Sequence, residues 1–159
     1  MMVNPHEVYI IEQGEHYPTK YKHRIAPKYN EGVHFISVFN VSNIYDNGSD
    51  DINKLYGITS PKIHENSARF GWRCKGEIIE IFAYYYINGE RFFEKMGETE
   101  INVRNEFLVD VSKNNYYFRF NDVEKVVVNT KNITAFRSFP YFGGNLPAPH
   151  RMTILIVEL

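Results

Sequence analysis

Short apolar and aromatic segments recur along the chain, with turn residues between them. No segment sustains the i, i+3, i+4, i+7 apolar spacing of an amphipathic helix, so the pattern predicts an almost entirely β protein, with a helix possible only over 50–56. Many short strands at even spacing are typical of an all-β fold, here a two-sheet antiparallel β-sandwich or jelly roll. The predicted strands are 8–12, 21–25, 34–41, 67–74, 77–87, 91–96, 99–103, 106–112, 116–121, 124–128, 135–141 and 152–158.

Alternation along these strands separates an inner from an outer face. Trp72, the only tryptophan, falls on the inner face of 67–74 and is expected in the core. The inner positions of 77–87 are Ile79, Ile81, Ala83, Tyr85 and Ile87, and those of 116–121 are Tyr116, Phe118 and Phe120. The outer positions combine aromatic rings with charged groups at Arg69, Arg73, Glu80, Phe82, Tyr84, Tyr86, Tyr117 and Arg119.

This outer set is the candidate binding surface, and three interpretations of it remain open. Aromatic rings beside arginine and carboxylate groups could stack on sugar rings and hydrogen-bond to their hydroxyls. Tyrosine and arginine are also enriched at protein interfaces. The third alternative is that the amino-terminal strands or a loop cover the face, since exposed apolar patches usually mark contacts.

The charge balance narrows the choice of partner. The chain has 18 basic and 19 acidic side chains, so no global field would attract a polyanion, and nucleic acid is not expected as a partner. The amino terminus has no basic region followed by an apolar run, which predicts neither a signal peptide nor a membrane span. We therefore expect a chain that is neither exported nor embedded in a membrane.

The sequence contains few features of a metal or cofactor site. The six histidines have neither the helical spacing nor the cysteine companions of a zinc site, and Cys74 falls on an inner face where thiols are usually inert. Asp46, Asp50 and Asp51 offer the oxygen ligands that calcium favours, without the regular ligand spacing of a calcium loop. The alternative is a solvated turn, so we expect no cofactor, with calcium as the minor possibility.

Three segments resemble a family of concanavalin-A-like jelly-roll proteins found in gut bacteria and their phages. They are HENSARFGWR (64–73), FAYYYINGER (82–91) and PYFGGNLPAPHRMTI (140–154), and the resemblance covers roughly residues 50–159. It implies that a loop leads into the last strand and supplies no catalytic assignment. The loop positions that match are Tyr141, Phe142, Gly143, Gly144, Asn145, Ala148, Pro149 and His150.

The same loop has a structural explanation in its residues. Pro147 and Pro149 stiffen the approach to the last strand, Gly143 and Gly144 permit tight or positive-φ backbone, and His150 stands where strand pairing begins. We therefore predict a structural role for Gly143, Gly144, Asn145, Pro149 and His150.

Enzymatic signatures of the wider superfamily are absent. Laminarinase-like glycosidases place carboxylates at alternate positions of one strand, whereas Glu77 and Glu80 are three apart and face opposite ways. The Gln-x-His strand of alginate-lyase-like members does not occur, and no nucleophile elbow is present. The prediction is a non-catalytic protein, and a lyase-like set is the alternative. Its members would be His64, Arg69, Tyr84 and His150.

These observations predict one domain over 1–159, with 1–30 a possible arm that packs on the sandwich or on a partner. Because the resembling family extends to phages, the expected role is a structural or decorating protein of a virion. It would assemble in the host cytoplasm with other protein subunits, with contact to host glycans as an additional expectation. The alternative is a bacterial carbohydrate-binding module or lyase-like enzyme in the cytoplasm or at the cell surface.

Overall fold

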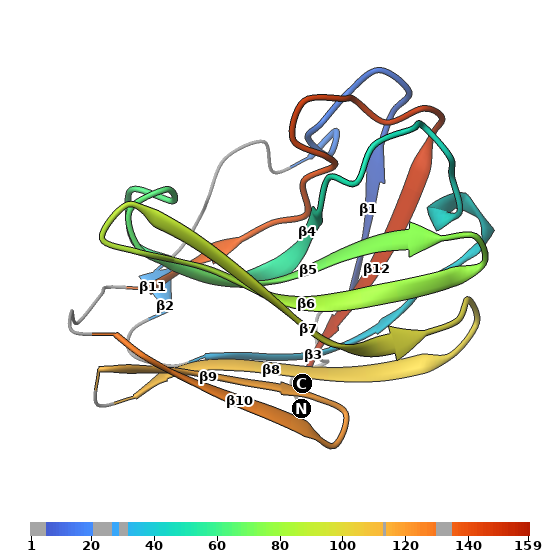
Figure 1. The fold of residues 1–159 in the computed structure, drawn as a ribbon. Helices are drawn as coiled ribbons and strands as arrows, with labels where there is room; N and C mark the ends of the chain where they lie inside the picture. The colour runs from blue at the N-terminus through green and yellow to red at the C-terminus, as the bar shows by residue number, and fades with distance from the viewer. Residues whose placement is uncertain (1–5, 21–26, 29–31, 113, 130–134) are drawn as a thin grey trace.

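The computed structural model describes residues 6–20, 27, 28, 32–112, 114–129 and 135–159. Two six-stranded antiparallel sheets face each other, in the orders β1-β12-β3-β8-β9-β10 and β2-β11-β4-β5-β6-β7 (Figure 1). The chain crosses repeatedly between the sheets, as in a jelly roll. The strands are β1 (His6–Ile11), β2 (Pro27–Lys28), β3 (Val33–Val38), β4 (Asn53–Thr59), β5 (Ser67–Lys75), β6 (Ile78–Ile87), β7 (Glu90–Thr99), β8 (Arg104–Ser112), β9 (Asn115–Phe120), β10 (Val123–Val128), β11 (Ala135–Ser138) and β12 (Met152–Glu158), and one 3-10 helix, η1, spans Val41–Asn43. The predicted all-β, two-sheet antiparallel sandwich is confirmed.

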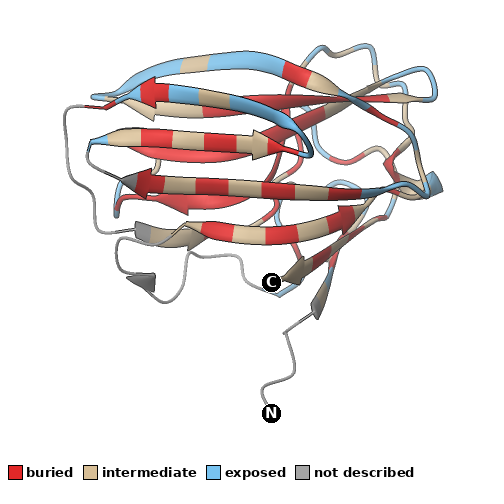
Figure 2. Ribbon diagram, turned by 90° about the horizontal axis from the view of Figure 1, so that it is seen from below, coloured by how far each residue is buried: buried red, intermediate tan, exposed pale blue. Residues whose placement is uncertain are grey.

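Aromatic side chains from both sheets fill the space between them. Phe107 on β8 stacks on Phe35 of β3 at 4.9 Å between ring centroids and meets Phe70 of β5 edge-on at 4.9 Å. Trp72 and Tyr116 are fully buried, as predicted. Figure 2 shows buried and less buried residues alternating along the sheet that contains β3 and β9, which is the period-2 pattern of strands with one face in the core.

Two predicted elements are wrong. Residues 53–59 form strand β4 instead of a helix, and its pairing register with β5 shifts between Lys54 and Tyr56. This shift breaks the alternation along the strand, so its sequence lacks a clear strand period. The separate strand predicted at 99–103 also does not form: β7 continues to Thr99, and Asn102 lies in a turn at φ 63°. The predicted strand 21–25 lies outside the described residues.

Parts of the predicted amino-terminal arm pair within the sandwich. β1 runs antiparallel to β12 from His6 to Ile11, and β2 pairs with β11. Among the described residues, no helix is long and apolar enough to cross a membrane.

Candidate functional site

A groove of about 550 Å³ opens on the outer face of the sheet that contains β4, β5 and β6. In Figure 1, loops rise above this sheet on the side away from β8 and β9. The groove brings together residues from distant parts of the chain. They are Tyr17, Lys54, Ile63, His64, Arg69, Tyr84, Tyr86, Arg91, Ser138, Phe139, Pro140, Tyr141, Gly144 and Asn145.

Strand pairing builds the floor of the groove. Arg69 on β5 lies opposite Tyr84 on β6 in the antiparallel register, and its guanidinium carbon is 5.2 Å from the centre of the Tyr84 ring. On the other side of Arg69 the partner in β4 is Gly57, where an added Cβ would come within 2.4 Å of the Ala68 carbonyl oxygen. Glycine at this position therefore allows the two backbones to approach closely enough to hold the floor together.

Lys54 on β4 extends into the floor from the neighbouring strand. Only 9% of the residue is exposed, and its Nζ donates to the Gly143 carbonyl oxygen at 3.1 Å. The same Nζ lies 4.8 Å from the centre of the Tyr84 ring and 5.6 Å from that of Tyr141. Burial, followed by the charge of Arg69, lowers the pKa of Lys54 from 10.5 to about 8.

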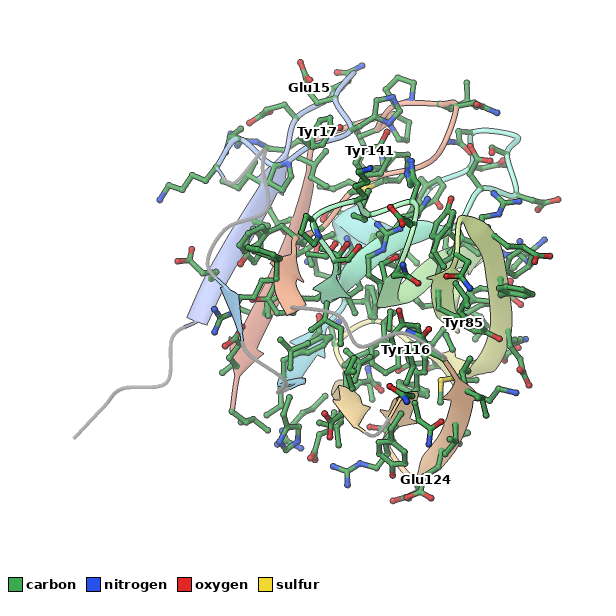
Figure 3. The ribbon with its side chains drawn as sticks, turned by 90° about the vertical axis from the view of Figure 1, so that its left-hand side faces the viewer. Glu15, Tyr17, Tyr85, Tyr116, Glu124 and Tyr141 are labelled. Atoms are coloured by element: carbon green, nitrogen blue, oxygen red, sulfur yellow. The ribbon has the colours of Figure 1, made fainter. Side chains whose placement is uncertain are left out.

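One wall of the groove consists of two loops that hydrogen-bond to each other. The Phe142 N–H donates to the His16 carbonyl oxygen at 2.8 Å, and His16 Nδ1 lies 2.7 Å from the Phe142 carbonyl oxygen. The ring of Tyr141 stacks on His16 at 5.2 Å and meets Tyr17 edge-on at 5.0 Å. Figure 3 shows Tyr17 and Tyr141 close together at the end of the molecule far from Glu124.

Asp51 fixes the backbone that continues this wall. Its Oδ2 accepts hydrogen bonds from the N–H groups of Gly144 at 3.2 Å and Asn145 at 2.9 Å. The hydrogen bond from Asn145 is the main cause that lowers the pKa of the Asp51 carboxyl below its usual value. Gly143 has φ +73°, and a Cβ there would lie 2.3 Å from the Leu146 carbonyl oxygen, so the loop requires glycine.

The opposite wall is the segment before β5. His64 contacts Tyr86 with 5.2 Å between ring centroids. The Gly89 N–H donates to the Glu65 carbonyl oxygen at 2.9 Å, which ties this segment to the β6–β7 hairpin. Asn88 and Gly89 both have positive φ, which a two-residue hairpin turn requires at both positions.

The charged side chains in the described lining of the groove are basic. Three cationic side chains line it, Lys54, Arg69 and Arg91, and no aspartate or glutamate occurs among its described lining residues. Burial raises the pKa of the Tyr84 phenol, which therefore stays protonated and able to donate at neutral pH. The arrangement offers hydrogen-bond donors between aromatic walls and provides no pair of carboxyl groups.

No protein-family model and no curated protein matches the chain. Among solved structures, the chain is similar to the carbohydrate-binding module CBM66 from Bacillus subtilis, with 8% identity and a TM-score of 0.42 over 83% of this chain and 74% of that one. It is also similar to the kappa-carrageenase from Pseudoalteromonas carrageenovora, solved with an oligotetrasaccharide of kappa-carrageenan. That match has 7% identity and a TM-score of 0.38 over 100% of this chain and 82% of that one. At these scores neither similarity carries weight for function.

The outer set predicted from the sequence does not form one surface. Arg69, Tyr84 and Tyr86 line the groove, whereas Tyr117 and Arg119 lie on β9 in the other sheet. Alternation separates inner from outer positions but does not say to which sheet a strand belongs, so these two residues were wrongly grouped with the rest.

Arg73, Glu80 and Phe82 form a separate structural patch on the same sheet as the groove. Arg73 Nε donates to Glu80 Oε1 at 2.9 Å, and its guanidinium carbon lies 4.9 Å from the centre of the Phe82 ring. Lys95 on β7 adds a second ion pair to Glu80 at 2.9 Å. Phe82 is only 3% exposed and packs against Ile52. Phe82 is therefore covered by Ile52 and by the Arg73 side chain.

The calcium candidates contact different partners. Asp46 accepts from the Gly48 N–H, Asp50 forms an ion pair with Lys75 at 2.9 Å, and Asp51 accepts from the groove wall. No group of three potential metal ligands was found in the described part of the chain.

The loop at 140–150 has both a structural and a lining role. Ala148 exchanges backbone hydrogen bonds with residues 14 and 15, and His150 Nε2 lies 2.8 Å from the Ser42 carbonyl oxygen. His150 does not line the groove, so it is separated from the other members of the lyase-like set. His64, Arg69 and Tyr84 do share the groove.

Sequence reasoning did not assign the polar and aromatic lining residues Lys54, Arg91, Tyr17 and Tyr141 to a binding surface. Lys54 fell in the wrongly predicted helix. The apolar and aromatic residues Leu55, Tyr56 and Ile58 beside it were the available strand signal. Tyr17 and Tyr141 meet only through long-range loop contacts, which no local pattern encodes.

Proposed function

We propose that this protein binds saccharide in the groove without turning it over. The observation that carries the proposal is the convergence of three tyrosine rings, from separate segments, around buried cationic donors. Tyr17, Tyr86 and Tyr141 offer apolar ring faces with polar tips, which suit the faces and hydroxyls of sugar rings. Lys54 and Arg69, which lie over the Tyr84 ring in the floor of the groove, supply N–H donors. The volume lies in the range of small-ligand sites, roughly 300–1,000 Å³.

The residues of the groove support binding over hydrolysis. Glycoside hydrolysis generally uses two carboxyl groups, one as acid and one as base or nucleophile. The described lining contains neither aspartate nor glutamate, so the groove lacks the side chains for that reaction.

A lyase reaction is the second candidate, because His64, Arg69 and Tyr84 line one groove together. In such a reaction a base removes the proton α to a uronate carboxylate, the bond to the leaving sugar oxygen breaks, and a carbon–carbon double bond forms. Incubating the protein with oligomannuronate and following the ultraviolet absorbance of the unsaturated product tests this candidate. Turnover that His64→Ala abolishes would contradict the non-catalytic proposal.

The predicted role in a virion stays a prediction. A sugar-binding groove suits a virion protein that touches host glycans and suits a bacterial carbohydrate-binding module equally. Co-purification of the chain with phage particles would favour the first.

A glycan array probed with the full chain tests the proposal. We expect binding to a subset of glycans, with the affinity reduced about fivefold in Tyr86→Ala because one ring contact contributes about 1 kcal/mol. Tyr117→Ala is the matched control, since Tyr117 is also half-buried on an outer face but lies in the other sheet. Absence of glycan binding, or equal losses in both variants, would contradict the proposal.

A further inference from the structure

We infer that the saccharide bound in the groove is acidic, with a carboxylate or sulfate group placed against Lys54, Arg69 and Arg91. The inference rests on the proposed function and goes beyond it by naming the chemical class of the ligand.

Three strands of one sheet bring the cations together. Lys54 comes from β4, Arg69 from β5 and Arg91 from β7, and all three line the groove. The Lys54 Nζ and the Arg69 guanidinium carbon lie 4.8 Å and 5.2 Å from the centre of the Tyr84 ring, so both cations converge on a single ring. Lys54 and Arg69 are almost completely buried. The two like charges are thus held over one ring with most of their surface buried, and the charge of Arg69 acts on Lys54.

Two other partly buried cations of this protein have carboxylate partners. Arg137 pairs with Glu158 at 2.6 Å, and Arg73 pairs with Glu80 at 2.9 Å. No carboxylate of the described residues lies within ion-pair distance of Lys54. A buried ammonium without a carboxylate partner is costly to keep charged, and a ligand anion would supply the missing counter-charge.

The groups that face Lys54 support this assignment. Burial and the charges of Arg69 and Arg91 lower the Lys54 pKa. The charge of Asp51 raises this pKa, but by less than burial or the charge of Arg69 lowers it. Asp51 itself is engaged by the loop amides of Gly144 and Asn145. The remaining neighbours, Tyr84 and Tyr141, present neutral rings. The local field is therefore positive, and a groove that focuses one sign of charge attracts ligands of the opposite sign.

Arginine adds selectivity for oxyanions that present two oxygen atoms to it. A guanidinium donates two parallel N–H hydrogen bonds to a carboxylate or sulfate, which a neutral hydroxyl does not match. Arg91 is exposed at the rim of the groove, where it can adapt to a longer acidic chain.

Titration calorimetry of the full chain with two matched pairs of probes tests the inference. The first pair is tetramannuronate against β-1,4-mannotetraose, and the second is dextran sulfate against dextran. We expect the acidic member of at least one pair to bind about tenfold or more tighter than its neutral partner, the difference made by one charge-assisted hydrogen bond. That affinity should fall as salt rises. The pair that shows the difference identifies the anion as carboxylate or sulfate.

Two variants and a control locate the effect. Arg91→Gln and Lys54→Met should each weaken binding of the acidic probe several-fold more than binding of the neutral probe. Arg119→Gln, which removes an arginine from the other sheet, should change neither. If neutral and acidic probes bind equally and Tyr86→Ala weakens both, the inference fails while the proposed function stands. If no saccharide binds, the proposed function fails as well.

Discussion

Replacing Lys54 by methionine should make the protein more stable, because the groove holds this ammonium at a cost to folding. The pKa of Lys54 is lowered from 10.5 to about 8 by burial and by the charge of Arg69. At neutral pH this lowering corresponds to about 3 kcal/mol of destabilisation, at about 1.4 kcal/mol per pKa unit. The hydrogen bond from Nζ to the Gly143 carbonyl oxygen is lost in Lys54→Met, which offsets about 1 kcal/mol. We therefore expect the free energy of unfolding to rise by about 2 kcal/mol near pH 7.

The pH dependence provides a sharper signature. The folded-state pKa of Lys54 is below the unfolded value, so between these values the unfolded chain binds one more proton than the folded chain. The stability of the wild-type protein should consequently rise with pH in this window, relative to that of Lys54→Met. Between pH 7 and pH 9 the relative gain should be about 1 kcal/mol.

Urea unfolding of both proteins at the two pH values measures these differences. Lys62→Met is the control, because the Lys62 side chain is 83% exposed and its replacement should have little effect. One result would refute this reasoning: Lys54→Met is no more stable than wild type, and the difference in stability does not change with pH. Lys54 would then carry no burial penalty, and the argument that the groove binds an anion would lose its basis.

Two further predictions concern the groove wall. Gly143→Ala should destabilise the protein by about 2 kcal/mol or more, because the added Cβ would lie 2.3 Å from the Leu146 carbonyl oxygen. The control Gly48→Ala has a similar positive φ but no atom near the added Cβ, so urea unfolding should show a smaller loss, and equal losses would contradict the clash. Asp51 has a lowered pKa, so it contributes stability above its unfolded pKa that is lost as pH falls through the folded value. The urea midpoint of unfolding should therefore decrease less as the pH is lowered in Asp51→Asn than in wild type or Asp122→Asn. The same pH dependence in all three proteins would contradict the role of Asp51.

The sandwich could be predicted because its strands are long enough to show period-2 alternation. Along β5, the prediction placed Trp72 inward and Arg69 and Arg73 outward, as the structure has them. The β4 strand was missed because a register shift after Lys54 disrupts that period, so Leu55 and Tyr56 both contribute to the core.

The site was only partly predictable, because a groove is made by contacts between distant segments. Strand alternation identified Arg69, Tyr84 and Tyr86 as outward-facing, and all three line the groove. It could not assign β9 to the opposite sheet, which is why Arg119 was grouped with them. Nor could it bring Tyr141 to the same place, since that residue depends on loop-to-loop hydrogen bonds.

A crystal structure of the full chain with the tightest-binding oligosaccharide tests the central claim most directly. The account predicts sugar rings against Tyr86 and Tyr141, with an acidic group within hydrogen-bond distance of the Lys54 Nζ. A saccharide bound instead over Tyr117 and Arg119 on the other sheet, with the groove empty, would contradict it.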